Sequence, residues 1–370
     1  MKKILTILAG LALMTSLASA QELANFARGG ATAKSPEFSG DSVFFRLSAP
    51  YATQVTLSGS WGQSVTMRKG ANGVWEAKVK TPEPEIYTYN FVVDGVRVND
   101  PQNYMVQRDG TRYLNMLMVP GERTENYFEA NQRGTVQYKW YDSKVLGINR
   151  RLTVYTPYGY EQNTSKKYPV LYLLHGAGGD EEAWSSMGRA AQILDNLIEK
   201  GLAEPMIVVM PNGNPGQQAA QTLGLPTVQV STPNAYVKSL CEEIVPFIEK
   251  EFRVIAKPAS RAIAGLSMGG GHTISSSQLY PSMFDYICPL SNGANRTDES
   301  VAQLKALKKD GYKLYWLACG KDDGLITRAN ALDATLTELG LEHTYFVSDG
   351  AHTWANWRLY LNTFAPLLFK

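Results

Sequence analysis

The chain has 370 residues, which at about 150 residues per domain is enough for two domains with a core in each. Hydrophobic residues make up 44% of it and charged residues 19%, a composition typical of folded globular proteins that excludes disordered, collagen-like and coiled-coil chains. The formal net charge is only +2, so we expect neither nucleic acid nor an acidic membrane surface as a partner, because both require clustered basic charge.

The first residues have the pattern of a secretory signal peptide. Residues 2–3 are lysines, residues 4–13 are apolar but too few to span a bilayer, and residues 18–20 read Ala-Ser-Ala, a small-residue cleavage signal. We therefore expect residues 1–20 to be removed and Gln21 to become the N-terminus. The mature chain would have 34 basic and 34 acidic residues, without membrane insertion, in the periplasm or outside the cell.

The segment from residue 33 to residue 120 alternates apolar and polar residues in short runs bounded by Gly, Pro, Asn or Asp. This pattern predicts a small antiparallel β-sandwich, and Asp94-Gly95 is a two-residue hairpin signal. The expected strands include residues 43–47, 54–57, 74–79 and 87–93. Residues 121–133 turn polar and lose the alternation, so a linker is expected there.

From residue 134 to residue 370 the pattern changes to buried strands that alternate with helices. The continuous apolar runs are residues 170–174, 206–210, 262–264, 286–288, 314–318 and 345–347. Helical spacing occurs between them, for example at 190–198 and 237–252. Strands that are apolar throughout are buried on both faces, so we expect an α/β domain in which a mostly parallel sheet has helices on both sides.

A candidate nucleophile lies where one of these strands turns into a helix. Residues 265–270 read Gly-Leu-Ser-Met-Gly-Gly, directly after the strand 261–264 and before a helical stretch. A serine in such a turn takes a strained backbone conformation, and the flanking glycines leave room for it, so its hydroxyl is exposed at a helix N-terminus. We therefore predict that Ser267 is a catalytic nucleophile.

A serine hydroxyl needs a base, and the chain has only four histidines. In this kind of fold the catalytic groups follow the C-terminal ends of the strands in the order serine, acid, histidine. His175 precedes the serine, His272 lies in the helix that the serine opens, and His343 comes before the strand 345–347 and therefore at the opposite edge of the sheet. His352, in the loop after that strand, is the predicted base.

The acid that orients this histidine should follow the strand 314–318. Two aspartates, Asp322 and Asp323, occur there, and spacing does not choose between them. Asp349 is too close to His352 in sequence to reach the back of its ring and is interpreted as a loop carboxylate.

The reaction also needs donors for the developing oxyanion. The backbone N–H of Met268, the residue after the nucleophile, is one candidate. The glycine-rich turn 175–179, His-Gly-Ala-Gly-Gly after the strand 171–174, is the expected source of the second.

These motifs together resemble carbohydrate esterase family 1, which contains feruloyl esterases and acetylxylan esterases with an α/β-hydrolase fold. The matching stretches are residues 173–179, 261–270, 318–323, 350–354 and 357–358. The resemblance implies that Asp323 is the acid and that the N–H of Ala177 is the second oxyanion donor. Residues 87–95 and 99–101 resemble the glycogen-debranching type of carbohydrate-binding module, an immunoglobulin-like sandwich.

The resemblance implies a secreted serine carboxylesterase that cleaves ester decorations of plant cell-wall polysaccharide, with feruloyl esters on arabinoxylan as the first choice. Acetylxylan esterase, acyl transfer to an alcohol, and a glycan-binding protein with a disused hydrolase domain are the alternatives. A long slot lined by Trp184 or Trp354 would favour ferulate, and packing in the core is the other role for these two side chains.

No cofactor is expected. The four dispersed histidines and the absence of paired Cys-x-x-Cys motifs indicate no metal site, and the three cysteines are interpreted as core thiols. The sandwich domain either holds polysaccharide near the site or shapes the cleft, in which case the polar loop 102–111 is the suspected wall.

Overall fold

The computed structural model describes residues 33–370, which fall into two compact units. The smaller unit contains residues 33–82, 87–105 and 115–117, and the larger unit contains residues 83–86, 106–114 and 118–370. The signal peptide expected over residues 1–20 lies outside the described residues. Two short segments from the N-terminal third of the chain thus belong to the larger unit.

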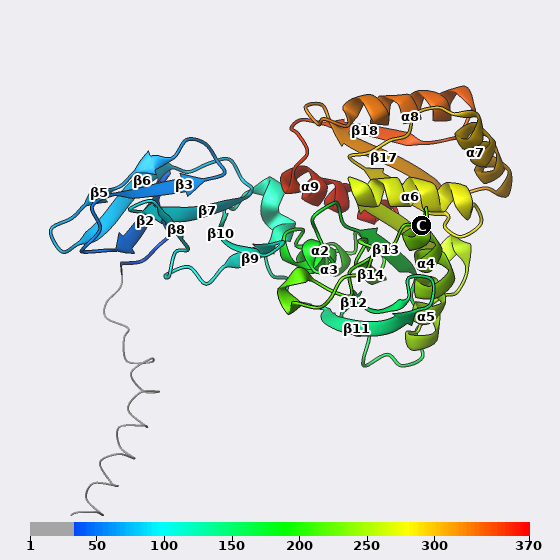
Figure 1. Ribbon diagram of the computed structural model, residues 1–370, viewed down its shortest axis with the longest axis horizontal. Helices are drawn as coiled ribbons and strands as arrows, with labels where there is room; N and C mark the ends of the chain where they lie inside the picture. The colour runs from blue at the N-terminus through cyan, green and yellow to red at the C-terminus, as the bar shows by residue number, and fades with distance from the viewer. Residues whose placement is uncertain (1–32) are drawn as a thin grey trace, which may run out of the picture. The chain divides into compact units, whose positions relative to one another are not determined.

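Two antiparallel sheets make up the N-terminal part, with the strand orders β1-β2-β6-β5 and β4-β3-β7-β10-β9, and β8 pairs with β7 (Figure 1). The strands are β1 (Glu37–Ser39), β2 (Ser42–Ser48), β3 (Val55–Gly59), β4 (Val65–Thr66), β5 (Arg68–Lys69), β6 (Val74–Lys80), β7 (Ile86–Val93), β8 (Val96–Val98), β9 (Val106–Asp109) and β10 (Arg112–Met118). The four strands expected from alternation are all present.

The side chains that alternate along these strands fill the space between the two sheets. Phe45 of β2 meets Tyr89 of β7 edge to face, with ring centroids 4.8 Å apart, and both side chains are buried. Trp75 is buried too and donates its indole N–H to the carbonyl of Ala49 at 2.9 Å. The pair Asp94-Gly95 has φ angles of 46° and 86° and joins β7 to β8, as expected of a tight hairpin.

The larger unit contains an eight-stranded sheet with the order β11-β12-β14-β13-β15-β16-β17-β18. Its strands are β11 (Thr135–Ser143), β12 (Ile148–Thr156), β13 (Val170–Leu174), β14 (Ile207–Pro211), β15 (Arg261–Leu266), β16 (Tyr286–Leu290), β17 (Leu314–Gly320) and β18 (Thr344–Ser348). The six strands from β14 to β18 are parallel, and β12 and β11 add antiparallel strands at one edge. Each expected apolar run forms one of the parallel strands.

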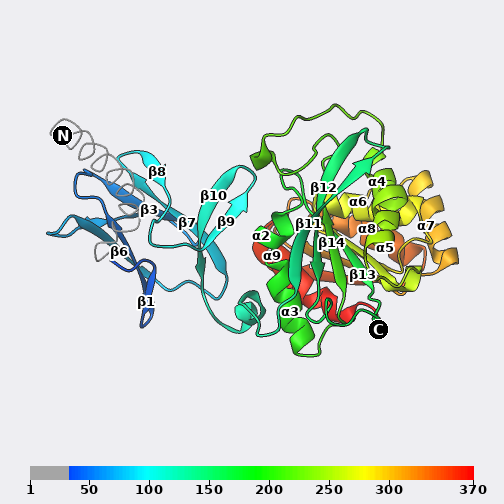
Figure 2. The ribbon, with the colours of Figure 1, turned by 90° about the horizontal axis from the view of Figure 1, so that it is seen from below.

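Helices cover both faces of this sheet, as Figure 2 shows: α3 and α9 pack together on one face, and α4, α5, α6, α7 and α8 lie on the other. The helices are α2 (Ala183–Ser186), α3 (Ala190–Glu199), α4 (Ala235–Ser239), α5 (Val245–Glu251), α6 (Met268–Leu279), α7 (Asp298–Asp310), α8 (Ile326–Glu338) and α9 (Trp354–Phe364). A π-helical turn, Leu240–Ile244, joins α4 to α5. The expected fold class, a sandwich followed by an α/β-hydrolase domain, is confirmed.

The segment 121–133, expected to be a linker, is packed against helix α3 in the larger unit. Its first half forms a 3₁₀ helix, Glu122–Tyr127, in which Tyr127 is fully buried. The side chain of Asn196 on α3 donates to the carbonyls of Asn126 and Phe128 at 3.2 and 2.8 Å. The polar composition of this segment therefore reflects hydrogen bonds to a helix.

Candidate active site

Ser267 lies at the sharp turn between β15 and α6. Its backbone has φ 53° and ψ −115°, a left-handed conformation that a residue with a side chain rarely adopts. The backbone on either side is fixed, because the N–H of Ser267 donates to Leu290 at 2.9 Å and the amide of Asn292 donates to the carbonyl of Ser267 at 2.6 Å. Stored strain of this kind presents the serine hydroxyl above the sheet.

The glycines around Ser267 are required by the close approach of main chains. A Cβ atom on Gly269 would lie 2.6 Å from the carbonyl oxygen of His175 and 2.7 Å from that of Leu174. Leu174 lies opposite Gly265 in the register of β13 and β15, so the two glycine-rich turns leave the same edge of the sheet next to each other. Only a residue without a side chain fits where they meet.

His352 and Asp323 come from the loops after two further neighbouring strands. Gly320 at the end of β17 pairs with Ser348 at the end of β18, which brings these loops together. Nδ1 of His352 lies 3.0 and 2.9 Å from the two carboxylate oxygens of Asp323. The Asp323 side chain is completely buried, whereas 36% of the His352 side chain is exposed. One ring nitrogen is thus held by a buried carboxylate, and the other remains accessible to the cavity.

The two aspartates that spacing could not separate have different environments. Asp322 is exposed, and its backbone N–H donates to the carbonyl of Gly350. Asp323 faces His352 and also accepts the N–H of Leu325 at 2.8 Å. Asp349 is exposed and forms an ion pair with Lys321 at 2.7 Å, which agrees with its interpretation as a loop carboxylate.

The other three histidines do not line the cavity that contains Ser267 and His352. Burial lowers the pKa of both His175 and His272, in the latter case to about 4. Nδ1 of His175 bonds the carbonyl of Gly176 at 2.7 Å and Nε2 accepts the N–H of Gly213 at 2.7 Å, so this ring is neutral and braces the glycine turn. His343 bonds Asp333 at 2.9 Å before β18.

The two proposed oxyanion donors come from the turn after β13 and from the first residue of α6. Ala177 lines the same cavity as Ser267, in the turn after β13. Met268 is the first residue of α6, where the N–H groups have no acceptor within the helix and the helix dipole is positive. An oxyanion hole needs two main-chain donors of this kind next to the nucleophile, and the role of these two N–H groups stays a prediction.

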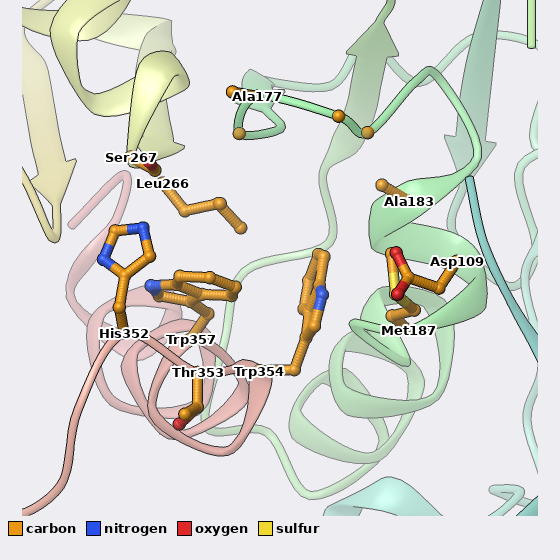
Figure 3. A pocket seen from close by; sticks show the side chains of 13 residues that line it. Asp109, Ala177, Ala183, Met187, Leu266, Ser267, His352, Thr353, Trp354 and Trp357 are labelled. Atoms are coloured by element: carbon orange, nitrogen blue, oxygen red, sulfur yellow. The ribbon is translucent and has the colours of Figure 1, made fainter. Parts of the chain in front are cut away.

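The cavity has a volume of about 410 Å³ and contains Ser267 and His352 in its lining. A chain of aromatic rings leads away from His352 (Figure 3): Trp357 lies edge to face on its imidazole with centroids 5.0 Å apart, and Trp354 lies edge to face on Trp357 at 5.1 Å. Ala183 and Met187 extend the apolar lining beyond Trp354.

Trp184, expected as a possible substrate contact together with Trp354, does not line this cavity. Only 1% of its surface is exposed, and its indole N–H donates to the carbonyl of Leu174 at 3.0 Å. Its ring supports Trp354 edge to face, with centroids 5.3 Å apart. The expectation is therefore corrected: Trp354 contacts the cavity, and Trp184 packs beneath it because its polar atom is satisfied by the end of a buried strand.

One charged cavity residue was not singled out by the motifs. Asp109, at the tip of the hairpin of β9 and β10, lines the cavity beside Ala183 and Met187 (Figure 3). It lies in the polar loop 102–111 that was suspected as a wall. The segment 106–114 belongs to the larger unit, and Gly110, at φ 60°, turns the hairpin against the glycine loop after β13.

A buried cluster of charges anchors this hairpin. Arg108 donates to both oxygens of Asp180 at 2.8 and 2.6 Å and to Glu182 at 3.0 Å. Glu181, whose pKa is raised by burial, accepts from Arg151 at 2.6 Å. The three acids follow the glycine turn 175–179 directly. Three consecutive acidic residues after a buried strand were the sequence signal for this cluster.

The described residues contain no group of three or more His, Cys, Asp or Glu side chains that could hold a metal ion. Cys241, Cys288 and Cys319 are free and buried, and burial raises the pKa of each thiol. Within residues 33–370 there is no helix with the length and hydrophobicity needed to cross a membrane.

A strained serine after a central parallel strand, with a histidine and a buried aspartate after later strands, defines the class of α/β hydrolases. Two family models match the chain: an esterase family, described as "Putative esterase", over residues 143–367, and carbohydrate-binding module 48 (isoamylase N-terminal domain) over residues 30–107. The chain belongs to this esterase family, a family of carboxylic-ester hydrolases.

Curated relatives include an endo-1,4-β-xylanase/feruloyl esterase of Xylanibacter ruminicola, which is 34% identical over 340 residues, covering 88% of this chain and 44% of the relative. Endo-1,4-β-xylanase Y of Acetivibrio thermocellus is 27% identical over 258 residues, covering 60% of this chain and 22% of the relative. The chain thus spans less than half the length of either relative.

Solved structures have the same fold. A ferulic acid esterase is 29% identical, with a TM-score of 0.54, and the match covers 64% of this chain and 98% of that one. The enterobactin esterase of Shigella flexneri is 18% identical with a TM-score of 0.63, and the match covers 89% of this chain and 94% of that one. The second likeness shows a shared fold.

Proposed function

We propose that this protein is an exported serine carboxylesterase that releases hydroxycinnamoyl groups, such as ferulate, from plant cell-wall polysaccharide. The observation that carries the proposal is one cavity in which Ser267 and the His352–Asp323 pair meet an aromatic wall. Export is inferred from the signal-peptide pattern of residues 1–20.

In the proposed reaction, the hydroxyl of Ser267 attacks the ester carbonyl while Nε2 of His352 takes its proton. The negative charge that develops on the carbonyl oxygen is met by the N–H groups of Ala177 and Met268. Asp323 holds the imidazole by Nδ1 and stabilises its charged form. The histidine then protonates the departing alcohol, and water, deprotonated by the same histidine, releases the acid from the serine.

The size and lining of the cavity favour a hydroxycinnamoyl group over acetate. A volume of about 410 Å³ lies in the range of sites for small organic molecules, and an acetyl group would leave most of it unfilled. Trp354, Trp357 and Met187 offer flat or deformable apolar surface, on which a planar aromatic acyl group would bury more area. The polysaccharide would stay outside and leave as the alcohol.

The relatives support a cell-wall substrate. The Xylanibacter ruminicola protein carries both xylanase and feruloyl esterase in its name, and it is similar to this chain over 340 residues. Arabinoxylan is therefore the proposed source of the ester, and the segment that matches carbohydrate-binding module 48 is proposed to contact polysaccharide.

The test is release of ferulate and acetate from one preparation of feruloylated and acetylated arabinoxylan, measured side by side. We expect ferulate release with a kcat/KM at least tenfold above that for acetate. The reverse order would assign the protein to acetylxylan esterases. A competing alcohol in the same assay would reveal acyl transfer as a new ester, and failure to release either acid would leave the glycan-binding alternative.

A further inference from the structure

The cavity has one carboxylate in its lining, that of Asp109, and Figure 3 shows it on the far side of Trp354 from Ser267 and His352. Apart from Ser267 and His352, the rest of the lining consists of glycines, alanines, Leu266, Met187, the tryptophans and one further polar residue, Thr353. An acyl group bound to Ser267 and lying along Trp354 would therefore direct its distal end toward Asp109. A charged acceptor at the end of an apolar slot is suited to a ligand with a polar group at its tip.

The position of Asp109 is fixed by its neighbour in sequence. Arg108 is buried, with 6% of its side chain exposed, and binds Asp180 through two hydrogen bonds. It also donates to the carbonyl of Gly110 at 2.7 Å, and its backbone N–H donates to Ser186 on α2 at 2.8 Å. The end of β9 that carries Asp109 is therefore fixed by the side-chain bonds of Arg108 to Asp180 and Gly110 and by its backbone bond to Ser186.

The Asp109 side chain itself stays available. It is 42% exposed, and its ion pair is with Arg112, at 3.2 Å from Oδ2, whose own side chain is 71% exposed. Such exposed pairs are weak and are screened by salt. A carboxylate has about four lone-pair sites, so Arg112 leaves acceptor capacity for a ligand.

We infer that Asp109 is the specificity-determining residue for acyl groups that carry a ring hydroxyl, accepting a hydrogen bond from the para-hydroxyl of the hydroxycinnamoyl ring. This inference rests on the proposed function. Hydrogen bonds to a charged acceptor are stronger than neutral ones, and a site that offers one discriminates against analogues that lack the donor. The enzyme would then prefer p-coumaroyl and feruloyl esters to cinnamoyl and dimethoxycinnamoyl esters.

The test compares kcat/KM for four methyl esters, which contain no sugar: p-coumarate and cinnamate, which differ by the hydroxyl, and ferulate and 3,4-dimethoxycinnamate, in which the hydroxyl is capped. We expect the wild type to favour each hydroxylated ester by about tenfold, a value reduced from that of a buried bond because Asp109 is partly exposed. Asp109→Leu, similar in shape but without an acceptor, should bring both ratios close to one, because kcat/KM falls more for the two hydroxylated esters than for cinnamate and 3,4-dimethoxycinnamate.

Two variants serve as controls. Arg112→Ala removes the exposed ion-pair partner and keeps the acceptor, so both ratios should be equal to or above those of the wild type. Asp109→Asn keeps a neutral carbonyl acceptor and should give intermediate ratios. Together they separate the acceptor from the general charge of the hairpin.

Three outcomes would overturn the inference. Equal losses on all four esters would make Asp109 a structural residue. Unchanged ratios on the methyl esters, with a loss confined to feruloylated arabinoxylan, would move its hydrogen bond to the sugar. Wild-type ratios in Asp109→Leu, with ferulate turnover intact, would reject the residue while leaving the proposed function standing. That function fails separately if the wild type hydrolyses none of these esters.

Discussion

The two ends of the cavity are held in place by different means. At the end with Ser267, the main chain fixes the position of the side chain. Ser267 has a φ of 53° in a glycine-rich turn, and a Cβ atom on Gly269 would collide with two carbonyls. At the end with Asp109, the hairpin is held by ion pairs of buried Arg108 with Asp180 and Glu182, which follow the glycine turn. The position of the proposed nucleophile thus depends on backbone geometry, and the position of the proposed selecting residue, Asp109, depends on ion pairs.

This difference separates chemistry from selection. Strained backbone tolerates few substitutions, because the neighbouring strands over-determine it. A hairpin anchored by one buried arginine can change its tip residues while the anchor stays, because residue 109 is partly exposed and residue 108 is not. Substitutions at the two ends should therefore have different effects. Near Ser267 they should lower the catalytic rate, and near Asp109 they should change substrate selectivity or protein stability.

The largest expected effect is at the nucleophile. Ser267→Ala removes one oxygen from a turn that other contacts hold, so turnover should fall by about four to six orders of magnitude with the fold intact. The measurement is kcat on a soluble feruloyl ester together with the urea midpoint of unfolding. Retention of more than a tenth of the wild-type rate would exclude Ser267 as the nucleophile.

The next effect is at the acid, where two adjacent aspartates allow a matched comparison. Asp323→Asn should lower kcat by up to about ten-thousand-fold, because an amide cannot hold His352 in the tautomer that accepts the serine proton. Asp322→Asn, at an exposed carboxylate, should change kcat by less than a factor of three. Equal small losses in both variants would place the orienting carboxylate elsewhere.

Most of the proposed catalytic residues could be named from the sequence, but the proposed selecting residue could not. Ser267 and His352 could be placed because strand order and chain order leave few positions at one edge of a parallel sheet. Asp322 and Asp323 could not be separated by spacing, because which of two neighbours turns inward depends on loop backbone. Asp109 lies in a different part of the chain, and its place in the cavity depends on the ion pair of its neighbour Arg108 with Asp180, 72 residues away in sequence.

The roles of Trp184 and Trp354 show the same limit. Both follow strand ends near the cleft, and periodicity does not tell which indole reaches the surface of the cavity. In the structure, Trp184 packs beneath Trp354, and the indole N–H of Trp184 donates a hydrogen bond to the carbonyl of Leu174. Which of the two indoles is buried thus depends on a hydrogen bond that forms only in the folded protein, and the sequence pattern does not show it.

The anchor of the selecting end can be broken directly. Arg108→Ala leaves the buried carboxylate of Asp180 without its bidentate partner, so the free energy of unfolding should fall by about 3–5 kcal/mol. The exposed neighbour provides the control, because Arg112→Ala should not shift the unfolding midpoint measurably. Part of the loss should return in the double variant Arg108→Met, Asp180→Asn. A single variant as stable as the wild type would show that the cluster does not hold the hairpin.

The smallest effect should appear at the reacting end as a dependence of stability on pH. His272, in the helix that Ser267 opens, is partly buried, and this burial, with a smaller effect of nearby His175, lowers its pKa from 6.5 to about 4. Between these two values the unfolded chain binds a proton that the folded chain excludes, so stability falls as the pH falls from 6.5 to 4. The full loss of stability from this group is about 3 kcal/mol, and above pH 6.5 it contributes no pH dependence.

His272→Leu removes the titrating ring. Between pH 7.5 and pH 4.5, the free energy of unfolding in urea should therefore decline less in this variant than in the wild type. Parallel declines in the two proteins would mean that His272 is protonated without cost in the folded state, and the acid sensitivity of this end would then have to come from His175, whose neutral ring braces the turn that carries Ala177.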